Sequence, residues 1–200
     1  MKFYQKLPII FSIFVTACAT PPPENSTYGW LGKTFFEPHA SYVQWNEEYA
    51  VTAAHFVSPS YYPAYKSELL DIQFIKIKSN KVPVWNEFKI GEKVSMVGFP
   101  NIDQNEKKVT GYTTGKLAVF NGVEVYQLVT TKIEQGMSGG PVFNDKKEVV
   151  GINIGYTSQP VLRDGKNEIQ SLFLPYGYIK QEWEKFKTNN KSSTIKIIKY

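Results

Sequence analysis

The chain has 200 residues, of which 42% are hydrophobic and 15% aromatic, and it contains a single cysteine. This length allows one large domain or two small ones, each with a real apolar core. The single cysteine excludes a fold that depends on an intramolecular disulfide, and the formal charge of +5 includes lysines in a segment that we expect to be removed.

Residues 1–17 have the pattern of a secretory signal peptide. Lys2 and Lys6 precede an apolar run that ends at Val15, and two small residues follow it. The run is about half as long as a segment that spans a bilayer. Loss of residues 1–17 lowers the formal charge from +5 to +3, which is too mild to indicate a nucleic-acid-binding protein.

The only cysteine, Cys18, comes directly after this segment. The word Val15-Thr16-Ala17-Cys18 resembles the lipobox of bacterial lipoproteins. The resemblance implies cleavage before Cys18 and diacylation of its thiol, and two acyl chains anchor a protein stably. Because Ala19 follows, it also implies the periplasmic side of the outer membrane. The alternative is an ordinary signal peptide followed by a free thiol.

Residues 18–28 are predicted to be a tether between the lipid and the folded part. They contain Pro21, Pro22 and Pro23 in a row, which cannot donate backbone hydrogen bonds and favour an extended chain. Such a segment acts as a semi-rigid spacer.

Residues 29–90 are expected to form a first β lobe and a linker. Apolar and polar residues alternate over 72–78, and strand-forming residues fill 41–45 and 49–54. A polar, proline-containing stretch then leads to Gly91. We therefore place the boundary between two lobes at this glycine.

Residues 91–175 are expected to form a second β lobe, and 176–200 a helix with a basic tail. Strands are predicted at 93–100, in a hairpin around Asn121-Gly122, and on both sides of the turn after Phe143. The only helical pattern runs from Tyr178 to Lys187. The last residues, 189–200, remain open between a disordered tail and a late strand.

A glycine-rich turn, Gly136-Met137-Ser138-Gly139-Gly140-Pro141, precedes one of these strands. Glycines beside Ser138 permit a tight turn that exposes the serine hydroxyl. The backbone N–H groups of Gly136 and Ser138 are then expected to point to one spot, as an oxyanion hole requires. A glycine-serine cluster is also an ordinary turn, so this word alone does not decide the function.

Two further pieces fit the same chemistry. The word Thr52-Ala53-Ala54-His55 ends one predicted strand, and Asp71 starts another. Together with the Ser138 turn, in the order His, Asp, Ser, they resemble the chymotrypsin-like (trypsin-like) serine proteases over roughly residues 35–187. The resemblance implies an all-β fold of two antiparallel, six-stranded-type β-barrels, with a C-terminal helix. It also implies an endopeptidase that acts through an acyl-enzyme.

The resemblance assigns Ser138 as nucleophile, His55 as general base and then acid, and Asp71 as the carboxylate that orients the imidazole. Histidine suits its role because its ordinary pKa lies near neutrality. Asp103 and Glu68 are the rival carboxylates. Only 16 positions separate His55 from Asp71, so the first barrel is expected to be trimmed.

Positions near Ser138 in the sequence bear on substrate specificity. By position relative to Ser138, Lys132 or Ile133 is expected at the base of the primary pocket. A wall and a substrate-pairing strand are expected from Ile154, Gly155 and Tyr156. Lys132 stands where trypsin-like members carry an aspartate, which argues against cleavage after Lys or Arg. An inward lysine would favour acidic residues, whereas one that extends into solvent would not.

No metal or other cofactor is implied, because the sequence has no Cys/His cluster. The expected partners are a protein or peptide substrate and the membrane, reached through Cys18. A rival of another class is a catalytically silent lipoprotein that binds a partner protein with the same fold. A second rival is an esterase with the same three residues, against which the lack of βαβ alternation counts.

Overall fold

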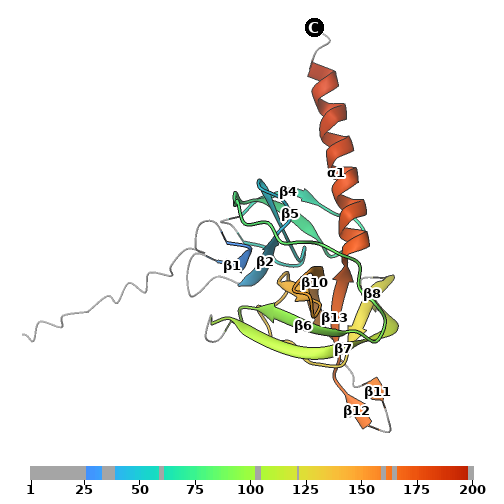
Figure 1. Cartoon of the computed structure of the whole chain (residues 1–200). Helices are drawn as coiled ribbons and strands as arrows, with labels where there is room; N and C mark the ends of the chain where they lie inside the picture. Colours follow the sequence, from blue (N-terminus) through green and yellow to red (C-terminus); the bar gives the residue numbers. More distant parts are fainter. Residues whose placement is uncertain are drawn as a thin grey trace, which may run out of the picture.

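The computed structural model describes residues 26–32, 39–58, 61–101, 105–120, 122–158, 161–163 and 166–197. The predicted signal peptide, Cys18 and most of the tether lie outside these residues. The described part is mostly β, with two antiparallel sheets, a small two-stranded ribbon and one C-terminal helix (Figure 1). The strands of the first lobe are β1 (Tyr28–Leu31), β2 (Ala40–Gln44), β3 (Tyr49–Thr52), β4 (Pro63–Lys66) and β5 (Gln73–Lys76).

The first lobe is a five-stranded sheet in the order β1-β2-β3-β5-β4. Every residue of β2 is buried, and Val43 faces Val51 across the β2–β3 pair in the core. The sequence predicted a trimmed barrel here. In the described residues the trimming leaves an open sheet of five strands instead of a closed barrel.

The second lobe is a closed barrel in the order β10-β13-β8-β7-β6-β9. The close pairing of β10 with β13 requires a glycine at position 151, because a Cβ on Gly151 would lie 2.4 Å from the Leu174 carbonyl oxygen. The strands that follow the first lobe are β6 (Lys93–Gly98), β7 (Lys107–Phe120), β8 (Val123–Val129), β9 (Pro141–Phe143), β10 (Val149–Tyr156), β11 (Val161–Arg163), β12 (Lys166–Glu168) and β13 (Ser171–Pro175).

The helix α1 (Tyr176–Ile197) is longer than the predicted segment from Tyr178 to Lys187. It follows β13 in the second lobe and runs alongside β4 and β5 of the first (Figure 1). Trp183 packs against Trp45, with ring centroids 6.0 Å apart, and against Phe74 at 5.1 Å. The helix thus ties the second lobe to the first by apolar burial, which is the main source of such stability.

Candidate functional site

His55 and Asp71 meet at the point where β3 ends and β5 begins. These two strands pair antiparallel, with Thr52 opposite Gln73, so the residues just beyond them lie close together. His55 Nδ1 lies 2.6 Å from Asp71 Oδ2, and the backbone N–H of His55 donates to Asp71 Oδ1 at 2.7 Å. One carboxylate therefore fixes both the ring and the backbone of the histidine.

The environments of these two side chains differ. The Asp71 side chain is only 2% exposed, whereas that of His55 is 43% exposed. The backbone N–H of Asp71 donates to the hydroxyl of Tyr126, a buried residue of the second lobe, at 2.9 Å. Asp71 is thus held from both lobes, while the imidazole of His55 is partly open to solvent.

Asp71 is the carboxylate that contacts His55 in the described residues. Glu68 lies in the loop before Asp71, lines a small pocket with His55, and makes no hydrogen bond to it in this part of the chain. The other rival, Asp103, lies outside the described residues.

The turn that carries Ser138 depends on two glycines in the left-handed region. Gly136 has φ of 95° and Gly139 has φ of 85°, conformations that other residues adopt with strain. A Cβ on Gly136 would lie 2.5 Å from Asn101 Oδ1. A Cβ on Gly139 would lie 2.2 Å from both the Ser41 carbonyl oxygen and Thr52 Oγ1. The serine turn is therefore pressed against β2 and β3, close to the start of the His55 turn.

Ser41 on β2 is a buried link between this turn and the first lobe. Its hydroxyl donates to the Gly136 carbonyl at 2.9 Å and accepts the Phe99 N–H at 2.9 Å. Its own N–H donates to the Ser138 carbonyl at 2.8 Å. Two of these bonds fix the backbone of the serine turn, and the third ties it to Phe99 at the end of β6.

The Ser138 hydroxyl donates to the Ile154 carbonyl at 2.9 Å. No hydrogen bond joins it to His55 in the described part of the chain. Catalytic hydrogen bonds are often loose without substrate. Among the described residues the N–H groups of Gly136 and Ser138 donate to no protein acceptor.

A shallow pocket lies next to the serine turn. Lys132 and Tyr156 are part of it, with the Lys132 Nζ 5.1 Å from the centre of the Tyr156 ring. Glu134 also lines it, but its carboxylate is paired with Lys107. The only charge in the lining that makes no ion pair in the described residues is that of Lys132. The full lining is Pro100, Asn101, Lys132, Ile133, Glu134, Gln135 and Tyr156.

Ile154 and Gly155 do not line this pocket. The Ile154 side chain is buried in the core, and its carbonyl is the group that meets Ser138. No atom lies within 4 Å of the position of a Cβ on Gly155, so this part of β10 faces open space.

Sequence reasoning missed Ser41 and Tyr126. Ser41 is a fully buried polar residue within an apolar strand, which is a weak local signal that its hydroxyl has partners. Tyr126 gave no such signal, because tyrosine is ordinary in a strand and its partner lies 55 positions away.

The described residues contain no group of three or more His, Cys, Asp or Glu side chains able to hold a metal ion. Their helices include none with the length and apolar character needed to cross a bilayer.

Residues 60–152 match the model of a trypsin-like peptidase domain family. The match covers just under half of the chain, including Asp71 and Ser138, and begins after His55.

Solved structures of bacterial proteases resemble the whole fold. A serine endoprotease from Yersinia pestis is 18% identical with a TM-score of 0.62, over 80% of this chain and 61% of that one. The active form of a protease from M. tuberculosis is 16% identical with a TM-score of 0.60, over 74% of each chain. The chain spans about 61% of the Yersinia chain's length. The TM-scores of these matches show that this chain has the trypsin-like fold, as the sequence predicted.

Proposed function

We propose that this protein is a serine endopeptidase that uses Ser138, His55 and Asp71. The observation that carries the proposal is the hydrogen bond between His55 Nδ1 and Asp71 Oδ2. It holds the imidazole tautomer in which the other nitrogen, Nε2, is free to accept a proton. The close packing of the Gly139 position against Thr52 supports it, because this brings the serine turn beside the histidine turn.

In the first half of the reaction, the Ser138 hydroxyl turns from Ile154 to His55. Its oxygen bonds to the substrate carbonyl carbon while its proton passes to His55 Nε2, and the carbonyl electron pair moves onto oxygen. The N–H groups of Gly136 and Ser138 stabilise this oxyanion, and one such donor lowers the barrier by roughly 3–4 kcal/mol. Collapse expels the amine, which takes the proton from Nε2 and leaves an acyl-enzyme.

In the second half, His55 Nε2 removes a proton from water, whose oxygen attacks the acyl carbon. The second oxyanion collapses, the carboxylic acid leaves, and Ser138 regains its proton from Nε2. Asp71 keeps its hydrogen bond to Nδ1 throughout and stabilises the imidazolium that forms twice.

Ser138 is expected to be the only hyper-reactive serine. The purified protein should become covalently labelled by a fluorophosphonate probe, because this probe needs a serine with an activating base and an oxyanion hole. Ser138→Ala should abolish labelling, as measured by intact mass and gel fluorescence. Ser95→Ala, which replaces a second-lobe serine on β6 away from the turn, is the control and should label like the wild type.

This experiment also separates the enzyme from the silent binding protein. If the wild-type protein folds but takes up no probe, the binding protein becomes the better reading. If Ser138→Ala labels as strongly as the wild type, a different serine reacts and the assignment is wrong.

We propose that the pocket beside the turn selects acidic side chains before the cleaved bond. Among the described residues that line the pocket, Lys132 is the charge without an ion partner, and its ammonium lies 5.1 Å from the centre of the Tyr156 ring. Because Lys132 is exposed, the effect should be small, roughly two- to fivefold in kcat/KM for glutamate over glutamine. Lys132→Met should erase the ratio on matched peptides, and Lys108→Met, at an exposed β7 site, should keep it. A wild-type preference for lysine would contradict the proposal.

We further propose that Cys18 is diacylated and anchors the enzyme on the periplasmic side of a bacterial outer membrane. The support is the lipobox-like word after a short apolar run. Protein extracted from membranes should have the mass of residues 18–200 plus a diacylglycerol group, and Cys18→Ser should be soluble. A mature chain that begins elsewhere, without lipid, would contradict the anchor and leave the peptidase proposal intact.

A further inference from the structure

Asn153 is a fully buried amide on β10 that contacts the serine turn, residues 136–141. Its side-chain NH2 group donates to the Met137 carbonyl at 3.1 Å and to the Val97 carbonyl at 2.8 Å. Both partners are carbonyl oxygens, which only accept, so the NH2 end of the amide must face them. One side chain thus joins the serine turn to β10 and β6.

The Met137 carbonyl matters because it belongs to the same peptide unit as the Ser138 N–H. The described residues contain no cis peptide bond, and in a planar trans peptide the C=O and N–H groups point in opposite directions. A carbonyl directed at Asn153 therefore turns the Ser138 N–H away from Asn153. This N–H donates to no protein acceptor among the described residues, and it is one of the two proposed oxyanion donors.

A second bond to the Met137 carbonyl lies within the turn itself. The Gly140 N–H donates to it at 3.1 Å and closes a β-turn in which Gly139 has φ of 85°. This bond moves with the turn, so it does not fix the carbonyl relative to the barrel. Among the described residues, the Asn153 side chain is the donor that ties this carbonyl to a strand outside the turn.

We propose that Asn153 is a positioning residue, which holds the peptide between Met137 and Ser138 so that the Ser138 N–H faces the substrate oxyanion. An oxyanion donor acts only when it lies at hydrogen-bond distance from the charged oxygen. A rotation of this peptide would carry the N–H out of line. The kinetic part of this inference rests on the proposed peptidase function, and the part that concerns the direction of the N–H rests on the hydrogen bonds alone.

Gln44 on β2 offers a matched control, because it is a buried amide of the same kind. Its NH2 group donates to the Asn46 carbonyl at 2.7 Å and to the Ile77 carbonyl at 2.6 Å, and neither belongs to the serine turn. In Gln44 as in Asn153, the amide oxygen is buried and accepts no hydrogen bond from the described residues. Loss of either amide should therefore destabilise the fold, and only loss of Asn153 should affect the oxyanion donor.

The kinetic test compares Asn153→Leu with Gln44→Met. Leucine keeps the branched shape of asparagine and methionine the length of glutamine, but neither can donate. Asn153→Leu should lower kcat on a peptide substrate about 10- to 100-fold with KM nearly unchanged, because the oxyanion forms only after the substrate has bound. Asn153→Ala adds no bulk and should do the same, so it decides the matter if Asn153→Leu does not fold. Gln44→Met should keep the wild-type kcat.

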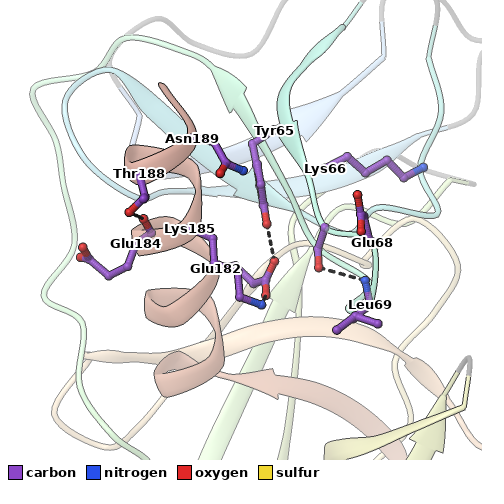
Figure 2. Close-up of a pocket in the computed structure, with 10 residues that line it drawn as sticks. Tyr65, Lys66, Glu68, Leu69, Glu182, Glu184, Lys185, Thr188 and Asn189 are labelled. Carbon is purple, nitrogen blue, oxygen red and sulfur yellow. Dashed lines mark hydrogen bonds and ion pairs between the residues drawn. The ribbon is translucent and has the colours of Figure 1, made fainter. Parts of the chain in front are cut away.

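A second control shows whether loss of a buried hydrogen bond lowers kcat by itself. Figure 2 shows Tyr65 reaching from β4 to the buried Glu182 carboxylate on α1, to which its hydroxyl donates at 2.7 Å. Tyr65→Phe removes this bond but keeps the ring that packs on Phe74 and Phe186. It should lower the thermal unfolding midpoint and leave kcat nearly unchanged.

A thionoester substrate tests the oxyanion site directly. Its charge develops on sulfur, which is larger than oxygen and a weaker acceptor, so well-placed N–H donors favour the matched oxoester. The ratio of kcat/KM for the oxoester to that for the thionoester should fall in Asn153→Leu and Asn153→Ala and stay at the wild-type value in both controls. A loss of folded protein alone would lower both rates alike and leave the ratio unchanged.

An NMR test needs no activity. In the Ser138→Ala background, the residual dipolar coupling of the backbone N–H at position 138 reports the direction of this bond relative to the barrel. Asn153→Leu and Asn153→Ala should change this coupling, and Gln44→Met and Tyr65→Phe should not. If the protein proves to have no peptidase activity, this change still supports the positioning role while the proposed function fails.

Four outcomes would overturn the inference. In the first, both Asn153 variants lose thermal stability while kcat, the ester ratio and the coupling stay at wild-type values, which is a purely structural role. In the second, kcat falls but the coupling at position 138 does not change. In the third, KM rises and kcat does not change. In the fourth, Gln44→Met has the same effect as Asn153→Leu.

Discussion

Asp71→Asn is expected to lower kcat by about four orders of magnitude without unfolding the protein. The aspartate accepts both the backbone N–H and the ring Nδ1–H of His55. An asparagine has only one acceptor oxygen, so it serves the backbone N–H and turns its NH2 group toward the ring. The imidazole then accepts at Nδ1 and carries its proton at Nε2, where it cannot take the proton of Ser138.

The measurements are steady-state peptidase rates and the thermal unfolding midpoint, with Glu68→Gln as control. Glu68 is exposed and lies three residues before Asp71, so its substitution should cost little. The opposite pattern, an active Asp71→Asn and an inactive Glu68→Gln, would show that the wrong carboxylate is assigned. Asp103→Asn should likewise leave the rate nearly unchanged.

Gly139→Ala is expected to destabilise the fold strongly. The new Cβ would lie 2.2 Å from the Ser41 carbonyl oxygen and from Thr52 Oγ1, in a backbone with φ of 85°. The alanine would be strained by the left-handed backbone, and its Cβ would also clash with these two oxygens. The free energy of unfolding should therefore fall by at least about 3 kcal/mol. Urea unfolding followed by fluorescence of the four tryptophans measures this loss.

A second glycine separates strain from collision. Gly91 has φ of 78°, but no atom lies within 4 Å of the position of its Cβ. Gly91→Ala should therefore cost only the strain of a left-handed alanine, about 1–2 kcal/mol. Equal losses in the two variants would mean that the serine turn is not pressed against β2 and β3 as described.

The sequence predicted the strands whose pattern is local. β2, β3 and β5 carry alternation or a run of strand-forming residues and were placed within a few positions. β4 was missed because it begins with Pro63 and is largely exposed, a composition that reads as loop. β13 was also missed. It is buried throughout, and a short, continuous apolar run has no period that distinguishes a strand from a helix.

The candidate site divides in the same way. His55, Asp71 and Ser138 were predicted because each sits in a recognisable word or at a strand start. Tyr126 and Ser41 were not predicted, because they contact residues 55 and 95 positions away. Such contacts exist only once the two sheets are packed together, and single-residue propensities carry no trace of them.

In the proposed peptidase, the hydrogen bond from Ser138 to the Ile154 carbonyl would oppose attack by the serine on a substrate. A neutral hydrogen bond of this kind is worth about 0.5–1.5 kcal/mol net, so breaking it unaided slows the first step by roughly two- to tenfold. A peptide long enough to offer its own N–H to the Ile154 carbonyl releases the serine as it binds, and a small ester or probe does not. Extended substrates should therefore acylate Ser138 faster than their intrinsic reactivity predicts. When only water fills the site, the Ser138 hydroxyl should stay hydrogen-bonded to the Ile154 carbonyl.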